Sequence, residues 1–88
     1  MSNYLYPATV ESNNEGGFIA KFRDVPEAIT EAWDLEELKN NARDALISAI
    51  DFYIEDRKAF PVGSTVKSGE IAIELPASVV AKVLLLNT

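Results

Sequence analysis

The sequence predicts one α+β domain with the element order β-β-β-α-β-α, and three observations support this prediction. Apolar and polar residues alternate in three short segments before residue 34, which is typical of half-buried strands. From Leu35 to Arg57 the apolar spacing changes to three and four residues, which indicates a helix. A fourth alternating segment and a final apolar segment follow. Because the chain has 88 residues and 48% of them are apolar, we expect residues 1–88 to form a single domain around one core.

The first three strands are predicted from alternation and from turn-forming residues. Tyr4–Val10 carries an aromatic face, and Phe18–Arg23 and Ala28–Trp33 alternate in the same way. The turn formers of Ser12–Gly17 join the first two segments into a β-hairpin. Because proline has no amide hydrogen, Pro7 favours an edge position or a bulge for the first strand.

The long helix has a recognisable start. Asp34 and Glu37 are spaced as a capping box, in which each side chain accepts a backbone amide left unpaired at a helix start. We expect the helix to run from about Leu35 to Arg57, since no proline intervenes before Pro61. Its second half is apolar over a wide arc, so we expect that half to be covered on more than one side.

The last third of the chain is predicted to be a loop, a strand and a second helix. Phe60–Lys67 contains proline and glycine, Glu70–Leu75 alternates, and Pro76 is suited to the first turn of a helix over Ala77–Leu86. This helix is apolar on nearly all sides, so we expect that it packs against another chain or that the natural protein continues past Thr88. A domain this small also gains stability by association, which predicts a homo-oligomer. The predicted contacts between copies are Ile47, Ile54, Val83, Leu84, Leu85 and Leu86.

Composition argues against several classes of function. The chain has neither cysteine nor histidine, so it lacks disulfides, thiolate zinc sites, the thiol nucleophile and the commonest general base. We therefore predict a non-enzymatic protein without a cofactor. No apolar run approaches the ~20 residues that span a bilayer, and no signal-peptide pattern begins the chain, which predicts a cytoplasmic protein that does not contact membranes. The net charge of −6 at pH 7 argues against nucleic-acid binding by this segment and suits a basic protein partner.

Acidic charge is concentrated between Asp24 and Glu37, a stretch with six carboxylates, no lysine or arginine, and the one tryptophan of the chain. Two interpretations stay open. Carboxylates at a helix start stabilise the helix, and the tryptophan would then pack in the core. Alternatively, the stretch is an acidic docking rim around an aromatic anchor, because tryptophan is enriched among interface hot spots. The contact residues predicted by the second interpretation are Glu27, Glu31, Trp33 and Asp34.

An enzymatic alternative follows from topology. A β-β-β-α-β core is similar to a shortened ribonuclease H-like fold, whose nucleases hold two metal ions with carboxylates on the strands. The strand carboxylates of this chain, Glu31, Glu70 and Glu74, lie far apart in the sequence. We therefore predict no metal site, and a divergent metal-dependent nuclease is the alternative function.

Several motifs occur in a fixed order along the chain. They are Tyr6-Pro7-Ala8, Glu15-Gly16-Gly17-Phe18-Ile19, Phe22-Arg23-Asp24-Val25-Pro26-Glu27-Ala28, Leu35-Glu36-Glu37 and Asn41-Ala42-Arg43-Asp44-Ala45-Leu46, followed by Ile50–Asp56 and Leu75–Asn87. Together these motifs resemble those of the HicB family of antitoxins, and the match covers essentially the whole chain.

The resemblance implies a HicB-like sheet and a role in a type II toxin–antitoxin system. In that family the amino-terminal domain binds and masks HicA, a small basic ribonuclease that cleaves messenger RNA. A carboxy-terminal DNA-binding domain that represses the operon normally follows, and this chain contains no such domain, so the resemblance implies DNA binding only for a longer parent protein. Trp33 departs from the small or polar residue usual at its position, which affects the expected contact surface.

Overall fold

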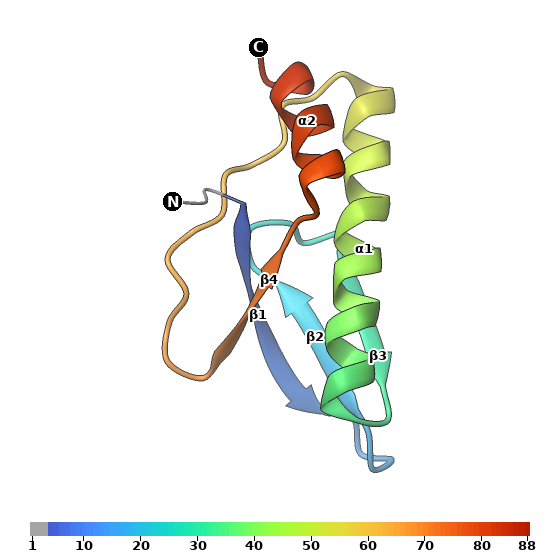
Figure 1. Ribbon diagram of the computed structural model, residues 1–88. Helices are drawn as coiled ribbons and strands as arrows, with labels where there is room; N and C mark the ends of the chain where they lie inside the picture. The colour runs from blue at the N-terminus through green and yellow to red at the C-terminus, as the bar shows by residue number, and fades with distance from the viewer. Residues whose placement is uncertain (1–3) are drawn as a thin grey trace.

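The computed structural model describes residues 4–88, which form a four-stranded antiparallel sheet and two helices (Figure 1). The elements are β1 (Leu5–Ser12), β2 (Phe18–Phe22), β3 (Ile29–Ala32), α1 (Leu35–Asp56), β4 (Glu70–Glu74) and α2 (Ala77–Leu86). Across the sheet the strands follow the order β3-β2-β1-β4. The α+β class and the element order predicted from the sequence are confirmed.

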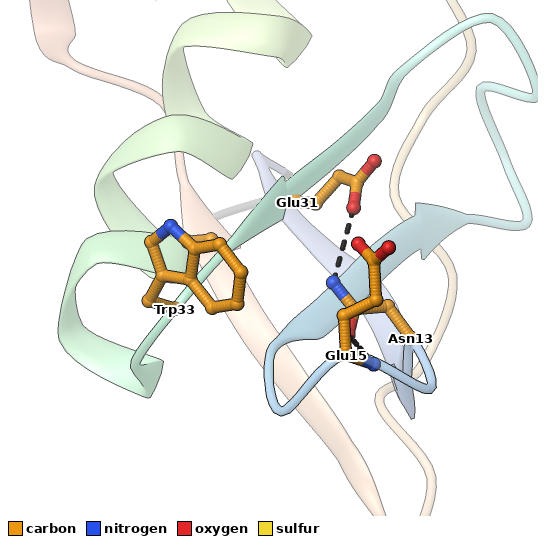
Figure 2. Close-up of a pocket in the computed structure, with 5 residues that line it drawn as sticks. Asn13, Glu15, Glu31 and Trp33 are labelled. Carbon is orange, nitrogen blue, oxygen red and sulfur yellow. Dashed lines mark hydrogen bonds between the residues drawn. The ribbon is translucent and has the colours of Figure 1, made fainter.

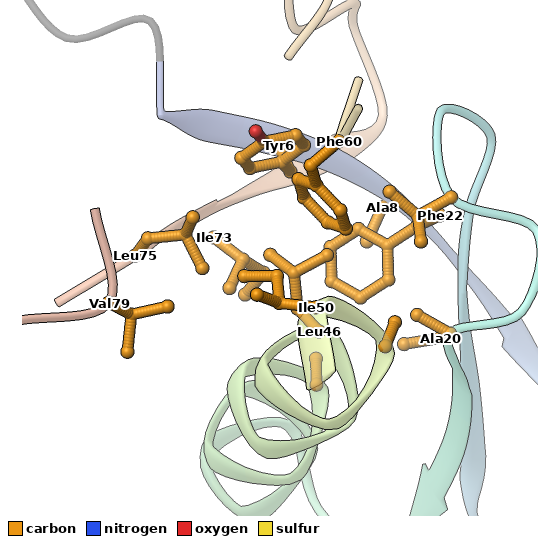
Figure 3. Close-up of a cluster of buried hydrophobic side chains, with 14 of the residues drawn as sticks. Tyr6, Ala8, Ala20, Phe22, Leu46, Ile50, Phe60, Ile73, Leu75 and Val79 are labelled. Carbon is orange, nitrogen blue, oxygen red and sulfur yellow. The ribbon is translucent and has the colours of Figure 1, made fainter. Parts of the chain in front are cut away.

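The core forms where α1 lies across one face of the sheet (Figures 1 and 3). Alternation along the strands places Tyr6 and Ala8 of β1 and Ala20 and Phe22 of β2 on this face, and all four are buried. The two alanines are small, so the helix can approach the centre of the sheet closely. The helix residues that complete this layer are Leu38, Ala42, Leu46, Ala49 and Ile50.

Pro7 lies in a central strand, so the edge position predicted for β1 is wrong. The β1–β2 pairing begins at Ala8 opposite Phe22, whereas Pro7 pairs with Ala72 of β4 in an uninterrupted register without a bulge. Because β2 does not reach Pro7, the missing amide removes no bond from the β1–β2 ladder. The proline marks the limit of one ladder and not the edge of the sheet.

Helix α1 begins as predicted and ends one residue earlier than expected. The Glu37 amide donates to Asp34 Oδ1 at 2.8 Å, which confirms the cap. At the other end Arg57 has a left-handed backbone with φ 57°, which stops the helix after Asp56. The cover expected on more than one side of its second half is present in part within residues 4–88, because α2 packs beside it whereas Phe52 and Ile54 remain 65% and 38% exposed.

Helix α2 packs beside the carboxy-terminal half of α1 (Figure 1). Its apolar residues divide between two environments, because Val79 and Val83 are buried whereas Leu84 and Leu85 are 52% and 77% exposed. Val83 belongs to the core of this chain, so its predicted contact with another copy is wrong. The exposed Leu84 and Leu85 form an apolar surface of the kind that favours contact with another chain. No helix in the described part of the chain is long and apolar enough to span a membrane.

The long segment between α1 and β4 is anchored through Phe60, whose ring is buried. Its ring centroid lies 5.7 Å from that of Tyr6 and 5.0 Å from that of Tyr53, both in edge-to-face geometry. Its backbone exchanges two hydrogen bonds with the Asn87 side chain, at 2.8 and 3.0 Å. Burial raises the pKa of Tyr6 to about 12, so its hydroxyl stays protonated and donates to the Pro61 carbonyl at 2.7 Å. One aromatic cluster thus joins β1, α1 and the loop.

The same loop is held farther along by polar contacts with residues just after β2. Asp24 accepts hydrogen bonds from the amide and hydroxyl of Ser64 at 2.8 and 2.6 Å. The Arg23 guanidinium makes a bidentate contact with the Glu70 carboxylate, at 2.9 and 3.2 Å, and donates to the Thr65 carbonyl at 2.7 Å. These contacts fix the loop against the face of the sheet opposite α1, where the side chains of Lys21 and Arg23 alternate with the buried Phe22.

Replacing Gly63 with alanine is expected to destabilise the protein by about 1–3 kcal/mol. A Cβ atom at this position would overlap the carbonyl oxygen of Leu5, and backbone cannot yield as a flexible side chain can. The free energy of unfolding, measured by urea titration, checks this. The matched control is Thr65→Ala in the same exposed loop, and equal stability of the Gly63→Ala and Thr65→Ala variants would contradict the packing described.

The Arg23–Glu70 contact predicts how stability depends on pH. The hydrogen bond from Arg23, followed by that from the Lys67 amide, lowers the pKa of Glu70 from its ordinary value of 4.5. Because the folded-state pKa lies below the unfolded one, this contribution to stability is complete above about pH 4.5 and is lost as the pH falls through the lower folded-state pKa. The Glu70→Gln variant should therefore lose less stability than the wild type between about pH 6 and pH 3. Urea titrations at both pH values measure this, and equal losses would refute it.

Candidate functional site

A shallow pocket of about 200 Å³ opens where the β1–β2 turn meets the end of β3. Its lining residues come from two segments far apart in the sequence, and they are Asn13, Glu15, Glu31, Ala32 and Trp33. Figure 2 shows the indole of Trp33 on one side and the carboxylates of Glu15 and Glu31 on the other. The pairing of β2 with β3 sets Phe18 opposite Ala32. Because of this register, the turn before β2 lies next to the residues that follow β3, and the pocket forms between them.

Asn13 organises the pocket. Its Oδ1 accepts the amides of Glu15 and Gly17, both at 2.9 Å, so one side chain closes the turn. Its Nδ2 donates to Glu31 Oε1 at 3.2 Å. The turn and β3 are thereby joined by a single side chain, which fixes the Glu31 carboxylate at the rim.

Gly17 provides the room for the aromatic wall. A Cβ atom on this residue would lie 2.8 Å from the carbonyl oxygen of Ala32 and 3.3 Å from Cε3 of Trp33. The indole therefore lies over a residue that has no side chain. Gly16, with φ +91°, supplies the left-handed backbone that turns the chain just before it.

The backbone of Trp33 is fixed while its ring remains open to solvent. Its amide donates to Glu37 Oε1 at 3.1 Å, and the Glu37 amide in turn donates to the N-cap Asp34, so the helix start holds the residue in place. The side chain is 66% exposed. Packing of Trp33 in the core, one of the two interpretations left open by the sequence, is therefore wrong.

The electrostatic character of the pocket is negative. Glu15 and Glu31 are both exposed, and none of the residues that line the pocket is a lysine or an arginine. Asp34 adds a third carboxylate beside Trp33 in the sequence, and one of its oxygens is engaged as the helix cap. Such a surface attracts cationic groups and repels phosphate.

The structure brings together two of the four predicted contact residues, Glu31 and Trp33, and places Asp34 next to them. Glu27 lies at the other end of β3, in the β2–β3 turn, where its carboxylate accepts the Tyr53 hydroxyl at 3.1 and 3.2 Å. Partial burial, followed by this hydrogen bond, raises the pKa of Tyr53.

The sequence did not identify Asn13 and Glu15 as site residues. Their turn was predicted, but its position against β3 was not.

A second candidate surface is apolar. A pocket of about 300 Å³ lies between the two helices and is lined by Ile54, Lys82, Leu85 and Leu86. Of the remaining predicted contacts between copies, Leu84 is exposed and Ile47 is partly buried against the core.

Carboxylates on the strands do not gather. Glu31 lies on β3 and Glu70 and Glu74 on β4, which are opposite edges of the sheet. Within residues 4–88, no three carboxylates form a group that could hold a metal ion. The described residues therefore provide no metal-binding cluster for the alternative function, a metal-dependent nuclease.

Comparison with known proteins places this arrangement in a family. A family profile described as "HicB_like antitoxin of bacterial toxin-antitoxin system" matches residues 5–84. The chain is 45% identical over 82 residues to the antitoxin HicB of Escherichia coli K12, a match that covers 93% of this chain and 59% of that protein. It is 49% identical over 86 residues to antitoxin HicB 2 of Photorhabdus laumondii, covering 98% of this chain and 60% of that protein. The chain thus spans about three fifths of the length of these relatives, and it belongs to the HicB-like antitoxin family.

Proposed function

We propose that this chain is the toxin-binding part of an antitoxin and neutralises a small, basic, HicA-type messenger-RNA-cleaving toxin by covering its surface. The observation that carries the proposal is the acidic pocket with its exposed Trp33. Tryptophan is enriched among the residues that contribute most to binding at protein interfaces. The negative rim around this ring complements a basic protein and speeds its encounter.

The proposal assigns no catalysis to the chain. We infer that its sheet is a shortened ribonuclease H-like frame that serves as a binding platform, and that residues 1–88 act as one toxin-binding domain. Because the relatives are longer, operon repression through DNA is proposed for a full-length protein only. We further propose that the protein acts in the cytoplasm, where messenger RNA is the target of such a toxin.

A second property is proposed from the apolar pocket between the helices. Leu85, which lines it, and Leu84, which follows Val83 in the same helix, are both exposed, and exposed apolar residues of this kind favour association. We infer that copies of the chain join through this surface as a homo-oligomer, with Ile54, Leu84, Leu85 and Leu86 in the contact. A monomeric mass at micromolar concentration in analytical ultracentrifugation would refute this inference.

The function is tested by co-expression with the protein encoded by the adjacent gene. We expect a stable complex that weakens as the salt concentration rises, and growth rescue when that protein is toxic by itself. An intact, salt-insensitive complex after Glu27→Lys and Glu31→Lys substitution would refute the acidic contact surface.

A separate assay addresses the nuclease alternative. The purified chain is incubated with RNA and magnesium or manganese, and we expect no turnover above the buffer control. Metal-dependent cleavage that co-purifies with the chain would instead favour the nuclease.

A further inference from the structure

The pocket at Trp33 has the dimensions of a side-chain site. Its volume of about 200 Å³ is below the roughly 300–1,000 Å³ of pockets that bind drug-sized ligands, so a nucleotide or cofactor would not be enclosed. One long side chain of a partner protein fits this scale. We therefore expect the pocket to be occupied by an amino-acid side chain of a partner protein.

The walls define the chemistry of that side chain. One wall is the indole of Trp33, and the face of an indole attracts a cation through its quadrupole. The other wall carries the carboxylates of Glu15 and Glu31, which accept hydrogen bonds from cationic donors (Figure 2). A guanidinium group is planar, so it can stack on an aromatic ring while its edge donates to carboxylates, whereas an ammonium is a compact and strongly hydrated charge.

Two parts of the pocket, the Glu31 carboxylate and the Trp33 backbone, are held in place without a partner. Asn13 holds the Glu31 carboxylate at 3.2 Å, and the Glu37 carboxylate holds the Trp33 amide at 3.1 Å. Gly17 lies under the indole and leaves it room. A site whose parts are already placed loses less entropy on binding.

We propose that this pocket receives one arginine side chain of the basic partner, with its guanidinium stacked on Trp33 and hydrogen-bonded to Glu15 and Glu31. The inference rests on the proposed function for the identity of the partner, but the chemistry of the pocket can be tested without the toxin. It adds Glu15 to the contact residues and makes Trp33 the ring that selects arginine.

The test uses the intact chain and three blocked tripeptides, acetyl-Gly-X-Gly-amide, in which X is arginine, lysine or the neutral isostere citrulline. Because Trp33 is the one tryptophan of the chain, its fluorescence reports on this pocket directly. We expect a saturable change with the arginine peptide at low salt, a response at least about threefold weaker with lysine, and none with citrulline. Equal responses to arginine and citrulline, or a stronger response to lysine, would overturn the proposal.

Two variants separate the pocket from the general negative charge of the chain. Glu15→Gln/Glu31→Gln should weaken arginine binding about tenfold. The matched control Asp44→Asn/Glu55→Gln removes two exposed charges of α1 and should change it less than about twofold. If both variants weakened binding of the arginine peptide equally, long-range attraction by the net negative charge would explain the binding, and the proposed site would be overturned. Far-UV circular dichroism checks that both variants fold.

The stacking itself has an independent signature. In proton NMR spectra, a guanidinium lying on the indole face shifts the arginine side-chain resonances of the peptide upfield. Trp33→Leu, which keeps an apolar wall without a ring, should abolish this shift and weaken binding about fivefold. An unchanged shift in Trp33→Leu would refute the stacking.

These results remain distinct from those of the proposed function. If the chain binds the adjacent-gene toxin but not the arginine peptide, the antitoxin role holds and the arginine pocket is wrong. If the peptide binds and the toxin does not, the pocket holds and the antitoxin role is wrong. A change in Trp33 emission on dilution of the chain without peptide would assign the ring to a contact between copies and also overturn the proposal.

Discussion

Replacement of Phe60 with alanine is expected to lower the free energy of unfolding by about 3–5 kcal/mol. The ring is 2% exposed and contacts both Tyr6 and Tyr53, so its removal leaves a cavity where the loop, β1 and α1 meet. Native domains are stable by only about 5–15 kcal/mol in total, so this one change should remove a large part of the margin. Urea titration followed by far-UV circular dichroism measures it. Tryptophan emission is the weaker probe, because Trp33 is already exposed in the folded state.

The control for this variant lies two residues away. Val62 belongs to the same loop and is 60% exposed, so Val62→Ala should change stability by less than about 0.5 kcal/mol. A loss below about 1 kcal/mol in Phe60→Ala would contradict the anchoring role of the ring, because it would mean that the loop packs loosely on the sheet.

Reversal of both pocket charges, in Glu15→Lys/Glu31→Lys, is expected to weaken the proposed toxin complex at least about 100-fold. Each lysine would replace an acceptor with a charge of the same sign as the basic partner, and like charges at an interface cost several kcal/mol. Isothermal titration calorimetry at two salt concentrations measures the affinity and its salt dependence. The salt dependence should become shallower in the variant, because fewer opposite charges meet.

Two comparisons localise the effect. Asp44→Lys/Glu55→Lys makes the same change of net charge on the exposed surface of α1 and should reduce the affinity far less, by about tenfold at most. Glu27→Lys tests the other end of β3, where Glu27 is engaged by the Tyr53 hydroxyl, and we expect a smaller loss than from Glu31→Lys. An equal loss from Glu27→Lys would extend the contact surface along the whole strand.

Local features of the chain were predictable because they depend on neighbours in the sequence. The cap formed by Asp34 and Glu37 acts within one helical turn, and alternation along β1 and β2 identifies the buried face of each strand. The hairpin turn also follows from its own residues, since Asn13 closes it with bonds to the next few amides. These features located the elements to within one or two residues of their observed ends.

Features that depend on which segments meet were not predictable in this way. Pro7 favoured an edge strand by its chemistry, but the limited reach of β2 lets a proline occupy a central one. Val83 and Leu84 are adjacent apolar residues of one helix, and only the packing of α2 decides that the first is buried and the second exposed. Because α2 is apolar on nearly all sides, its sequence pattern does not indicate which of its residues are buried.

The candidate site shows the same division. The sequence by itself determined an acidic, cysteine- and histidine-free α+β domain with a capped helix directly after Trp33. The tertiary structure decided that Trp33 faces solvent, that Glu15 lies across from it, and that Glu27 belongs elsewhere. The physical reason is range: capping and alternation act between residues close in the chain, whereas the pocket depends on the register of β2 against β3, which pairs residues on separate segments.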